Sequence, residues 1–596
     1  MVVSVSETLN PISNIVTEPS ARINAQELVV FSRGQSVPGF LLAANEALRA
    51  GRKDDALDLL REQDVEALLV CERTGSPRID LLYMLAKLLL ALGQTPQALK
   101  VSQQIVTCEP SAVAFFHRAL AYRQNEQLAE AITWLERAIQ ADPEQSLYQH
   151  IRANYCLDDE CVDEAFRRLE TLHERGMLDT AMYEDSLGGS FSVPGIKRIQ
   201  LHEGYRRLGA MMAQGVQPVA GPVLNADPER RLRVGFMSPD FRRCSTAVPF
   251  EVFLKGRDRQ DLEIWAYSNV CESDWVTQRI AGNVDRFIPV HGESVAQLAQ
   301  RIAQDRIDIL VAFGGYVRDH LLRVFPYRPA PVQVEYGWVC TTGLTDVDYR
   351  LTDAVVDPPD TRSLFSETLV YLDGGAYFFI PPLDCPLICP LPAISRGYVT
   401  FGSFNRTDKM SRGVVDCWGR ILQAVPNSRL LLKSPAGEED LLRKRCLELL
   451  VRMGIDPQRI EIHGSSPYFD YLSLFNQVDI ALDTWPWNGA TTTIEALWMG
   501  VPILTLTGEL MTDRTGLSIL SRVGLEAFST TDSDTYVAKA VAFAGQWGAL
   551  NTIRRGLRDR LLNSPVCNPR RVGDELGKAF RLMWRRWCAQ HPPPSC

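Results

Sequence analysis

The sequence predicts an α + α/β protein, in which a solenoid of helices is followed by two α/β domains with parallel sheets. Small residues recur in pairs at a fixed spacing through the first third of the chain, as is typical of stacked helix pairs. Beyond about residue 231, short apolar runs alternate with helical stretches in two successive sets, which predicts two parallel sheets covered by helices. A proline-rich segment separates the two sets.

The composition indicates several domains and excludes some classes of partner. A chain of 596 residues exceeds the size at which a single core keeps growing. A net charge of -9 offers no basic surplus for phosphodiester backbones, so nucleic acid is not expected as a partner. No signal peptide or membrane span is predicted, and we expect a cytoplasmic protein. Fourteen cysteines without C-x-x-C pairs and eight histidines without H-x-x-x-H spacing predict reduced thiols and no metal site.

The small residues of the first third stand twelve positions apart within each pair. From the second pair onward the pairs repeat every 33 or 34 residues, a period that resembles the tetratricopeptide repeat. We expect such repeats over 36–190, a loosely ordered segment over 1–35 and a connecting helix over 191–230. A solenoid of this kind typically binds a protein or peptide in its concave face. The pairs are Ala44 with Ala56, Ala86 with Ala98, Ala119 with Ala131, and Ala153 with Ala165.

The two sets of strands predict two Rossmann-like domains, over 231–380 and 398–565. The proline-rich segment 381–397 is expected to link them, and a helix is expected over 566–590. In doubly wound domains ligands bind at the carboxyl ends of the strands, so two such domains form a cleft. The predicted strands are 232–238, 262–269, 285–290 and 308–313 in the first domain, and 398–404, 429–433, 459–464, 479–484 and 501–506 in the second.

The stretch WPWNGATTTIEALWMG (485–500) follows a predicted strand and opens a helix through three threonines. The unpaired N–H groups of a helix N-terminus attract phosphate, and Thr491 and Thr492 add hydroxyl donors there. The same letters also fit a capping box, Thr492-x-x-Glu495, which needs no ligand. Glu495 could instead accept hydrogen bonds from ribose hydroxyls. The residues alone leave these interpretations open.

Two further loops follow the first strand of each predicted sheet. In GSFNRTDK (402–409), Lys409 could reach a diphosphate as a point charge, although a loop lysine can equally be solvated. SPDFRRCST (238–246) faces the cleft from the other domain and is too polar and bulky for a dinucleotide-binding loop, which disfavours a hydride-transfer cofactor. No D-x-D stands at the end of a predicted strand, so a metal-dependent transfer is not supported.

Together these segments resemble the bacterial members of the O-GlcNAc transferase and SPINDLY-like glycosyltransferase family. The resemblance covers nearly all of 231–590, and tetratricopeptide repeats are the usual companion. It implies a GT-B fold and a metal-independent, inverting transfer from a sugar nucleotide, most often UDP-N-acetylglucosamine, to serine or threonine hydroxyls of proteins. The segments include RVGFMSPDFR, DILVAFGGY, RPAPVQVEYGW, TTGLTDVDYRLTD, PNSRLLLK and DIALDTWPWNGATTTIEALWMGVPILTL.

The resemblance also assigns roles to residues of the second domain. Lys409 would neutralise the diphosphate, Thr491 and Thr492 would bind it, and Glu495 would hold the ribose. The remaining predicted donor-binding residues are Tyr471, which would stack on the base, Arg514, which would lie near the phosphates, and Arg406, Asn488 and Gly489 in the two donor loops.

Departures from the family pattern concentrate on the acceptor side. Asp240 and Cys244 are the candidate catalytic residues there, but Cys244 stands where the family commonly has a histidine. A cysteine could act as a base only as a thiolate in an electropositive pocket. Tyr316 also replaces a histidine, and residues 337–343 depart from the usual Gly-Tyr-Pro-x-Thr-x-Gly.

The sequence therefore favours a glycosyltransferase and leaves alternatives. One is a tetratricopeptide scaffold that binds a nucleotide but has lost turnover. Another is a transferase that uses GDP-fucose or a non-protein acceptor. No separate cofactor is expected beside the nucleotide sugar, and a homo-oligomer is compatible with the sequence.

Overall fold

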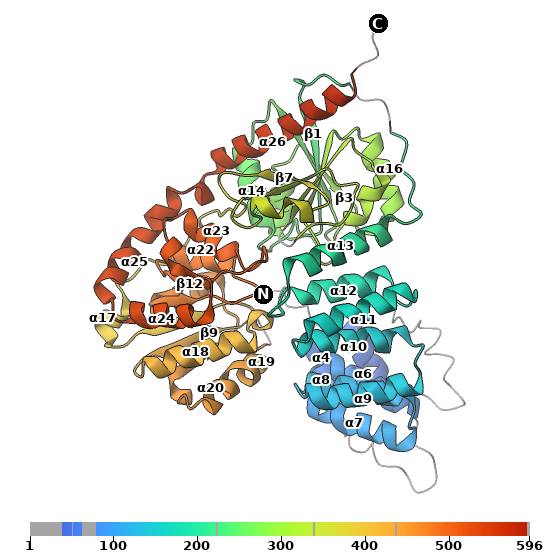
Figure 1. Ribbon diagram of the computed structural model, residues 1–596, viewed down its shortest axis with the longest axis vertical. Helices are drawn as coiled ribbons and strands as arrows, with labels where there is room; N and C mark the ends of the chain where they lie inside the picture. Colours follow the sequence, from blue (N-terminus) through green and yellow to red (C-terminus); the bar gives the residue numbers. More distant parts are fainter. Residues whose placement is uncertain are drawn as a thin grey trace. The chain divides into compact units, whose positions relative to one another are not determined.

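The computed structural model describes residues 39–49, 52–61, 79–221, 225–337, 340–434 and 438–592. The chain divides into two compact units, Leu9–Gly189 and Ser190–Cys596 (Figure 1). The loosely ordered segment expected over 1–35 lies outside the described residues. No helix of the described chain is both long enough and apolar enough to cross a membrane.

The first unit is built from paired antiparallel helices. The small residues of the repeat lie where paired helices cross: Ala86, Ala98, Ala119 and Ala131 are at most 1% exposed. Alanine at these positions lets two helices approach closely, because it adds only a methyl group between the backbones. The helices are α3 (Gly39–Arg49), α4 (Lys53–Arg61), α6 (Ile79–Ala91), α7 (Thr95–Cys108), α8 (Ala112–Gln124), α9 (Leu128–Ala141), α10 (Ser146–Asp158), α11 (Val162–Glu174) and α12 (Thr180–Ser190).

The second unit begins with α13 (Arg198–Ala213) and then forms a seven-stranded, all-parallel sheet. The strand order is β3-β2-β1-β4-β5-β6-β7, so the order reverses between β1 and β4. Buried runs such as LRVGFMS, with helices covering the faces, are typical of a parallel sheet. The strands are β1 (Leu232–Ser238), β2 (Leu262–Ser268), β3 (Arg286–Pro289), β4 (Ile309–Gly314), β5 (Val332–Gly337), β6 (Tyr349–Thr352) and β7 (Thr368–Tyr371).

The C-terminal helix α26 (Pro569–Gln590) belongs to the core of this first sheet, beside α14 (Ala247–Gly256) (Figure 1). Phe580 of α26 packs with Phe236 of β1, with 6.1 Å between ring centroids. Glycine at Gly256 permits the close approach, because a Cβ there would lie 1.7 Å from the carbonyl oxygen of Pro569. The chain therefore returns to its first domain after completing the second.

The second domain is a six-stranded parallel sheet with the order β10-β9-β8-β11-β12-β13. Its order reverses between β8 and β11, which makes their carboxyl ends the expected ligand crevice. The connecting segment contains a short helix, α17 (Pro392–Arg396), that its proline content did not predict; Pro392 stands in its first turn, where proline is tolerated. The strands are β8 (Thr400–Ser403), β9 (Arg429–Lys433), β10 (Ile460–His463), β11 (Ile480–Leu482), β12 (Ile503–Leu506) and β13 (Ser529–Thr530).

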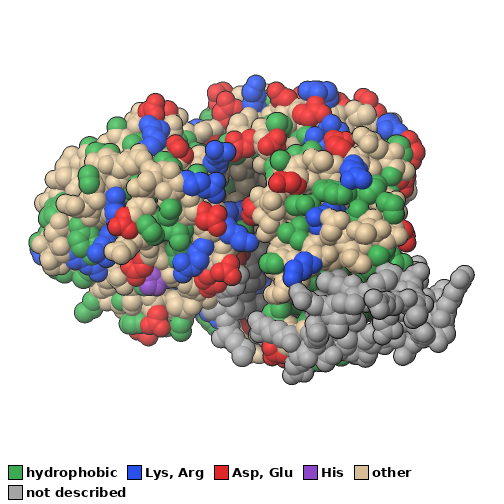
Figure 2. Space-filling model, turned by 90° about the horizontal axis from the view of Figure 1, so that it is seen from below, with side chains coloured by type: hydrophobic (Ala, Val, Ile, Leu, Met, Phe, Trp, Pro, Cys, Tyr) green, Lys and Arg blue, Asp and Glu red, His purple; other side chains and the backbone are tan. Residues whose placement is uncertain are grey.

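The surface carries charges of both signs. Among the described residues on the face shown in Figure 2, lysine and arginine side chains are interspersed with aspartate and glutamate. This distribution agrees with the net charge of -9 and provides no broad basic surface on that face for a polyanion.

Candidate active site

The turn that follows β11 is organised by a carboxylate that the sequence reasoning missed. Asp483 is fully buried, and its Oδ1 accepts hydrogen bonds from the backbone N–H groups of Thr484 (2.9 Å) and Gly489 (2.8 Å). Its Oδ2 accepts from the Thr505 hydroxyl at 2.8 Å. Burial raises the pKa of Asp483 above its ordinary value. An acidic residue at the end of an otherwise apolar strand, as in DIALDT, is the signal that could have identified it.

Gly489 and Asn488 shape this turn. A Cβ on Gly489 would lie 2.3 Å from Oγ1 of Thr492, so only glycine fits there. Asn488 is 1% exposed; its side chain donates to the Thr484 carbonyl at 2.7 Å and accepts from the Gly516 N–H at 3.1 Å. The side-chain amide of Asn488 therefore holds the turn together. The backbone carbonyl of Asn488 is the group that contacts Lys409 in the candidate site.

Helix α22 (Thr491–Trp498) begins at this turn without a side-chain cap. Its N-cap residue is Ala490, so the capping-box interpretation of Thr492 and Glu495 is wrong. Thr492 lies inside the first turn, where its hydroxyl donates to Oδ1 of Asn405 at 3.1 Å. Thr491 is half-buried at the same helix end. An N-terminus that lacks a side-chain acceptor, with hydroxyls beside it, suits an anionic ligand.

Lys409 reaches the same turn from the loop after β8. Its Nζ donates to the backbone carbonyl of Asn488 at 2.9 Å. The side chain is half-buried, and desolvation, with a contribution from neighbouring Arg406, lowers the pKa of Lys409. Lys409 is therefore not a freely solvated loop lysine. Arg406 forms an ion pair with Asp408 at 2.9 Å.

Glu495 and Tyr471, the residues predicted to hold the ribose and the base, are joined by a hydrogen bond. Glu495 is 6% exposed; one carboxylate oxygen accepts from the Tyr468 hydroxyl at 2.9 Å and the other from the Tyr471 hydroxyl at 2.7 Å. Burial raises the pKa of Glu495 to about 7. The Tyr471 ring also packs edge-on against Phe475, with centroids 5.6 Å apart.

Arg514 joins the two domains. Its Nε donates to the Val355 carbonyl of the first domain at 2.6 Å, and a terminal nitrogen donates to the Gly508 carbonyl of the second domain at 3.0 Å. The role of Arg514 near the phosphates stays a prediction, and in the structure its side chain makes a contact between the two domains.

The acceptor-side candidates follow β1. Asp240 is 9% exposed, and burial raises the pKa of its carboxyl. Its backbone carbonyl accepts from the thiol of Cys244 at 3.4 Å. Burial, reinforced by the Asp240 charge, raises the pKa of Cys244 to about 12. These surroundings favour the thiol of Cys244 over its thiolate.

Tyr316 follows β4 on the same edge of the first sheet. Its hydroxyl donates to the Thr342 carbonyl at 2.5 Å, which ties two loops of this edge together. Trp338 and Val339, part of the unusual 337–343 loop, lie outside the described residues.

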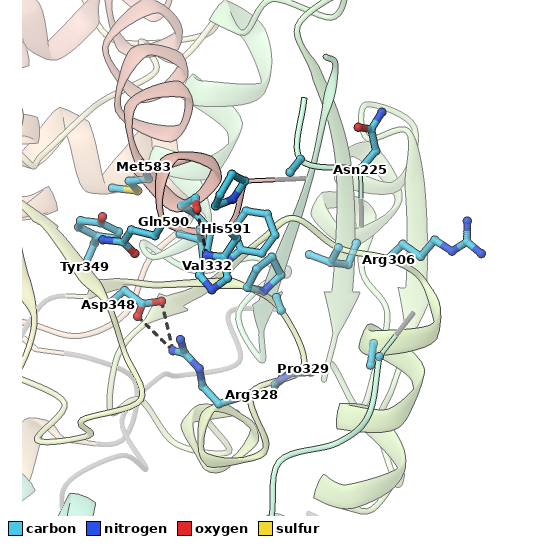
Figure 3. A pocket seen from close by; sticks show the side chains of 18 residues that line it. Asn225, Arg306, Arg328, Pro329, Val332, Asp348, Tyr349, Met583, Gln590 and His591 are labelled. Atoms are coloured by element: carbon cyan, nitrogen blue, oxygen red, sulfur yellow. Dashed lines mark hydrogen bonds and ion pairs between the residues drawn. The ribbon is translucent and has the colours of Figure 1, made fainter. Parts of the chain in front are cut away.

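A cavity of about 670 Å³ lies at the opposite edge of the first sheet (Figure 3). Its lining includes the first residues of β5 and β6 and the end of α26. Arg328 and Asp348, two of its lining residues, form an ion pair at 3.1 Å, whereas Arg306 points away. Because it lies at the amino ends of these strands, it is separate from the candidate active site.

No group of three or more histidine, cysteine, aspartate or glutamate side chains in the described part of the chain is arranged to hold a metal ion.

Comparison with known proteins identifies the class. The family model described as glycosyl transferase family 41 matches residues 216–382 and 393–576, and a tetratricopeptide repeat model matches 112–145. The chain therefore belongs to glycosyl transferase family 41. This confirms the predicted family and the predicted combination of helical repeats with paired α/β domains.

Two curated relatives from Arabidopsis thaliana resemble this chain. The chain is 38% identical over 373 residues to the probable UDP-N-acetylglucosamine–peptide N-acetylglucosaminyltransferase SPINDLY of Arabidopsis thaliana, covering 62% of this chain and 41% of the relative. It is 30% identical over 391 residues to the Arabidopsis protein SEC, named as a probable enzyme of the same activity, covering 63% of this chain and 39% of SEC. The chain thus spans about two fifths of the length of these curated relatives.

A solved structure matches more of the chain. A mutant of the O-GlcNAc transferase of Thermobaculum terrenum is 29% identical, with a TM-score of 0.69, and the match covers 89% of this chain and 100% of that protein. The likeness extends beyond the two α/β domains.

Proposed function

We propose that this protein is a glycosyltransferase that moves N-acetylglucosamine from UDP-N-acetylglucosamine to serine or threonine hydroxyls of proteins. The observation that carries the proposal is the uncapped N-terminus of α22 with the Lys409 ammonium fixed 2.9 Å from the Asn488 carbonyl beside it. Two independent sources of positive potential therefore meet at the turn between β11 and α22. The printed names of the relatives support the donor and the acceptor class.

In the proposed reaction the acceptor oxygen forms a bond to the anomeric carbon while the bond from that carbon to the diphosphate breaks. The electron pair leaves with UDP, and the hydroxyl proton passes to a base of the protein. Lys409 and the N-terminus of α22 stabilise the negative charge that develops on the departing diphosphate. This requires no metal ion and inverts the anomeric configuration.

Asp240 is the proposed base. It lies at the carboxyl end of β1, and its raised pKa makes it a better proton acceptor than an exposed aspartate. We do not assign this role to Cys244, because burial raises the pKa of its thiol. We assign Glu495 to the ribose hydroxyls and Tyr471 to the base of the nucleotide, since the two side chains are already joined by a hydrogen bond.

We further propose that the helical repeats bind the acceptor protein, in the cytoplasm. The solenoid architecture supports this, because stacked helix pairs present an extended concave surface to polypeptides.

Transfer assays with the full chain test the proposal. Labelled N-acetylglucosamine should enter protein from UDP-N-acetylglucosamine, and Lys409→Ala should reduce kcat far more than it weakens UDP binding measured by calorimetry. Lys539→Ala is a matched control, because Lys539 also donates to backbone carbonyls of the second domain but lies on α24 (Ser533–Ala544).

Three outcomes are informative. UDP binding without any turnover would favour the scaffold alternative. Faster transfer from GDP-fucose would correct the donor. Unchanged kcat in Lys409→Ala would refute the assigned role of Lys409.

A further inference from the structure

Trp487 lies beneath two cations of the candidate donor site. The Lys409 Nζ is 4.9 Å from the centroid of its indole ring, and the Arg406 guanidinium carbon is 5.4 Å from it. The Trp487 side chain is half-buried in the turn between β11 and α22, and its backbone carbonyl accepts from the Thr484 hydroxyl at 2.7 Å. The Lys409 ammonium therefore has two partners in this turn, the Asn488 carbonyl and the indole ring.

The indole is itself held by a row of rings that crosses from the second domain to the first. Phe191, 2% exposed, meets Trp487 edge to face with centroids 6.1 Å apart. Phe191 stacks on Tyr205 at 5.9 Å, and Tyr205, fully buried in α13, contacts Tyr316 at 4.6 Å. Tyr316 is the residue that ties the loops after β4 and β5 together. The row thus begins at the turn that carries the donor site and ends at the acceptor-side loops.

This arrangement limits the freedom of Lys409. The face of an indole ring attracts a cation, most strongly when both are shielded from water. A lysine side chain otherwise loses considerable rotamer entropy when it is fixed on a ligand. A ring that is already locked by buried neighbours presents its face without further reorganisation, so the ammonium is in place before a diphosphate arrives.

We propose that Trp487 is a positioning residue for the transfer reaction, which holds Lys409 and Arg406 toward the diphosphate, and that Phe191 fixes the Trp487 ring for this purpose. The inference rests on the proposed function and deepens it. It gives Phe191, which lies before α13 and outside the donor loops, a part in the chemistry of the second domain. The sequence motifs of the donor loops do not indicate this part.

Trp487→Leu tests the proposal by removing the π face while keeping an apolar side chain. Since a shielded cation–π contact is worth about one tenfold factor, kcat should fall roughly tenfold while UDP affinity changes little. The loss should be clearly smaller in a Lys409→Ala background, because the part that acts through the contact between Trp487 and Lys409 is then already absent. Phe191→Leu should lower kcat in the same direction by a smaller factor.

Tyr398→Leu is the matched control. Tyr398 is half-buried in the second domain beneath the Arg429 guanidinium at 4.6 Å, but it precedes β8 at the amino end of the sheet. This variant should keep the wild-type kcat. A Trp487→Leu variant that keeps the wild-type kcat, or that loses as much in the Lys409→Ala background, would overturn the proposal.

A second measurement tests the positioning role without requiring turnover. Absence of turnover in the wild-type protein would count against the proposed function and not against the contact between Trp487 and Lys409. The titration of Lys409 can be followed by NMR of labelled lysine side chains, with its signal assigned from Lys409→Arg. Loss of the indole face removes stabilisation of the charged ammonium, so Lys409 should titrate at lower pH in Trp487→Leu than in the wild type and in Tyr398→Leu. An unchanged titration would refute the positioning role directly.

Discussion

Replacing Asp483 by alanine should open the turn on which the donor site is built. Asp483, Thr484 and Thr505 are all fully buried, and Gly489 is buried as well. Alanine removes the only carboxylate oxygen that the N–H groups of Thr484 and Gly489 are seen to bond in this structure. Asparagine at the same position keeps one oxygen for these N–H groups. It loses the charge and, because an amide nitrogen cannot accept a hydrogen bond, the acceptor of the Thr505 hydroxyl.

The magnitude follows from these bonds. A buried donor left unpaired costs about 1–3 kcal/mol, so two of them make Asp483→Ala cost about 2–6 kcal/mol. A hydrogen bond to a charged group exceeds a neutral one by about 1 kcal/mol, so Asp483→Asn should cost about 2 kcal/mol. Either value is large against the total stability of a domain, about 5–15 kcal/mol.

Hydrogen exchange of the full chain, followed by mass spectrometry, measures this local opening without requiring two-state unfolding of a multidomain protein. Peptides covering 483–495 should exchange faster in Asp483→Ala than in Asp483→Asn, and faster in both than in the wild type. Peptides covering β1 serve as the internal control and should be unchanged. Equal protection of 483–495 in all three proteins would show that the Asp483 bonds do not hold the turn.

Three further predictions concern single residues of the cleft. Gly489→Ala places a Cβ against Thr492, and such overpacking costs about 1–3 kcal/mol. UDP binding measured by calorimetry should therefore weaken about tenfold, while uridine binding changes less. Equal losses for both ligands would contradict a phosphate-specific effect. The pKa of Glu495 is raised to about 7, so its carboxyl is protonated below that pH and ionised above it. Uridine affinity should therefore rise between pH 6 and 8, since ribose hydroxyls donate more strongly to a carboxylate, and a Glu495→Gln variant that kept this rise would refute the assignment. Cys244→Ser should change the transfer rate less than twofold, and rapid alkylation of Cys244 by iodoacetamide at neutral pH would reveal a thiolate and contradict its raised pKa.

The fold was predictable because its signals are local. The predicted strand 232–238 coincides with β1, and 262–269 exceeds β2 by one residue, since buried parallel strands appear as uninterrupted apolar runs. The fixed spacing of small residues likewise reports helix pairs that are adjacent in sequence. The position of α26 was less predictable, because its contact with the first sheet joins residues more than three hundred positions apart.

The candidate site was predictable only in part. Lys409 stands in the loop after β8 and Thr492 in the first turn of the helix after β11, both at the carboxyl ends of strands, where ligands bind to parallel sheets. The capping box failed because the motif specifies a pattern of letters and not the residue at which the helix begins, which here is Thr491. Asp483 was missed although an acidic residue at the end of an apolar strand is a local signal for it. Trp487 was missed because its contact with the ring of Phe191 joins distant parts of the chain, which no local pattern records.

Contacts between the two domains couple the position of the candidate donor residues to that of the first domain. Arg198 of α13 donates to the Asp357 carboxylate of the first domain at 2.8 Å and to the Glu509 carbonyl of the second at 2.7 Å. Arg514 of the second domain donates to the Val355 carbonyl of the first, and the Ser518 hydroxyl of the second domain donates to the Asp353 carboxylate of the first at 2.7 Å. Three of these four contacts, those made by Glu509, Arg514 and Ser518, involve the 508–518 region, which follows β12 on the same edge as α22. A shift of this region would therefore move the N-terminus of α22 relative to Asp240. Arg514 is thus expected to influence the proposed transfer by setting the distance between the proposed donor and acceptor residues.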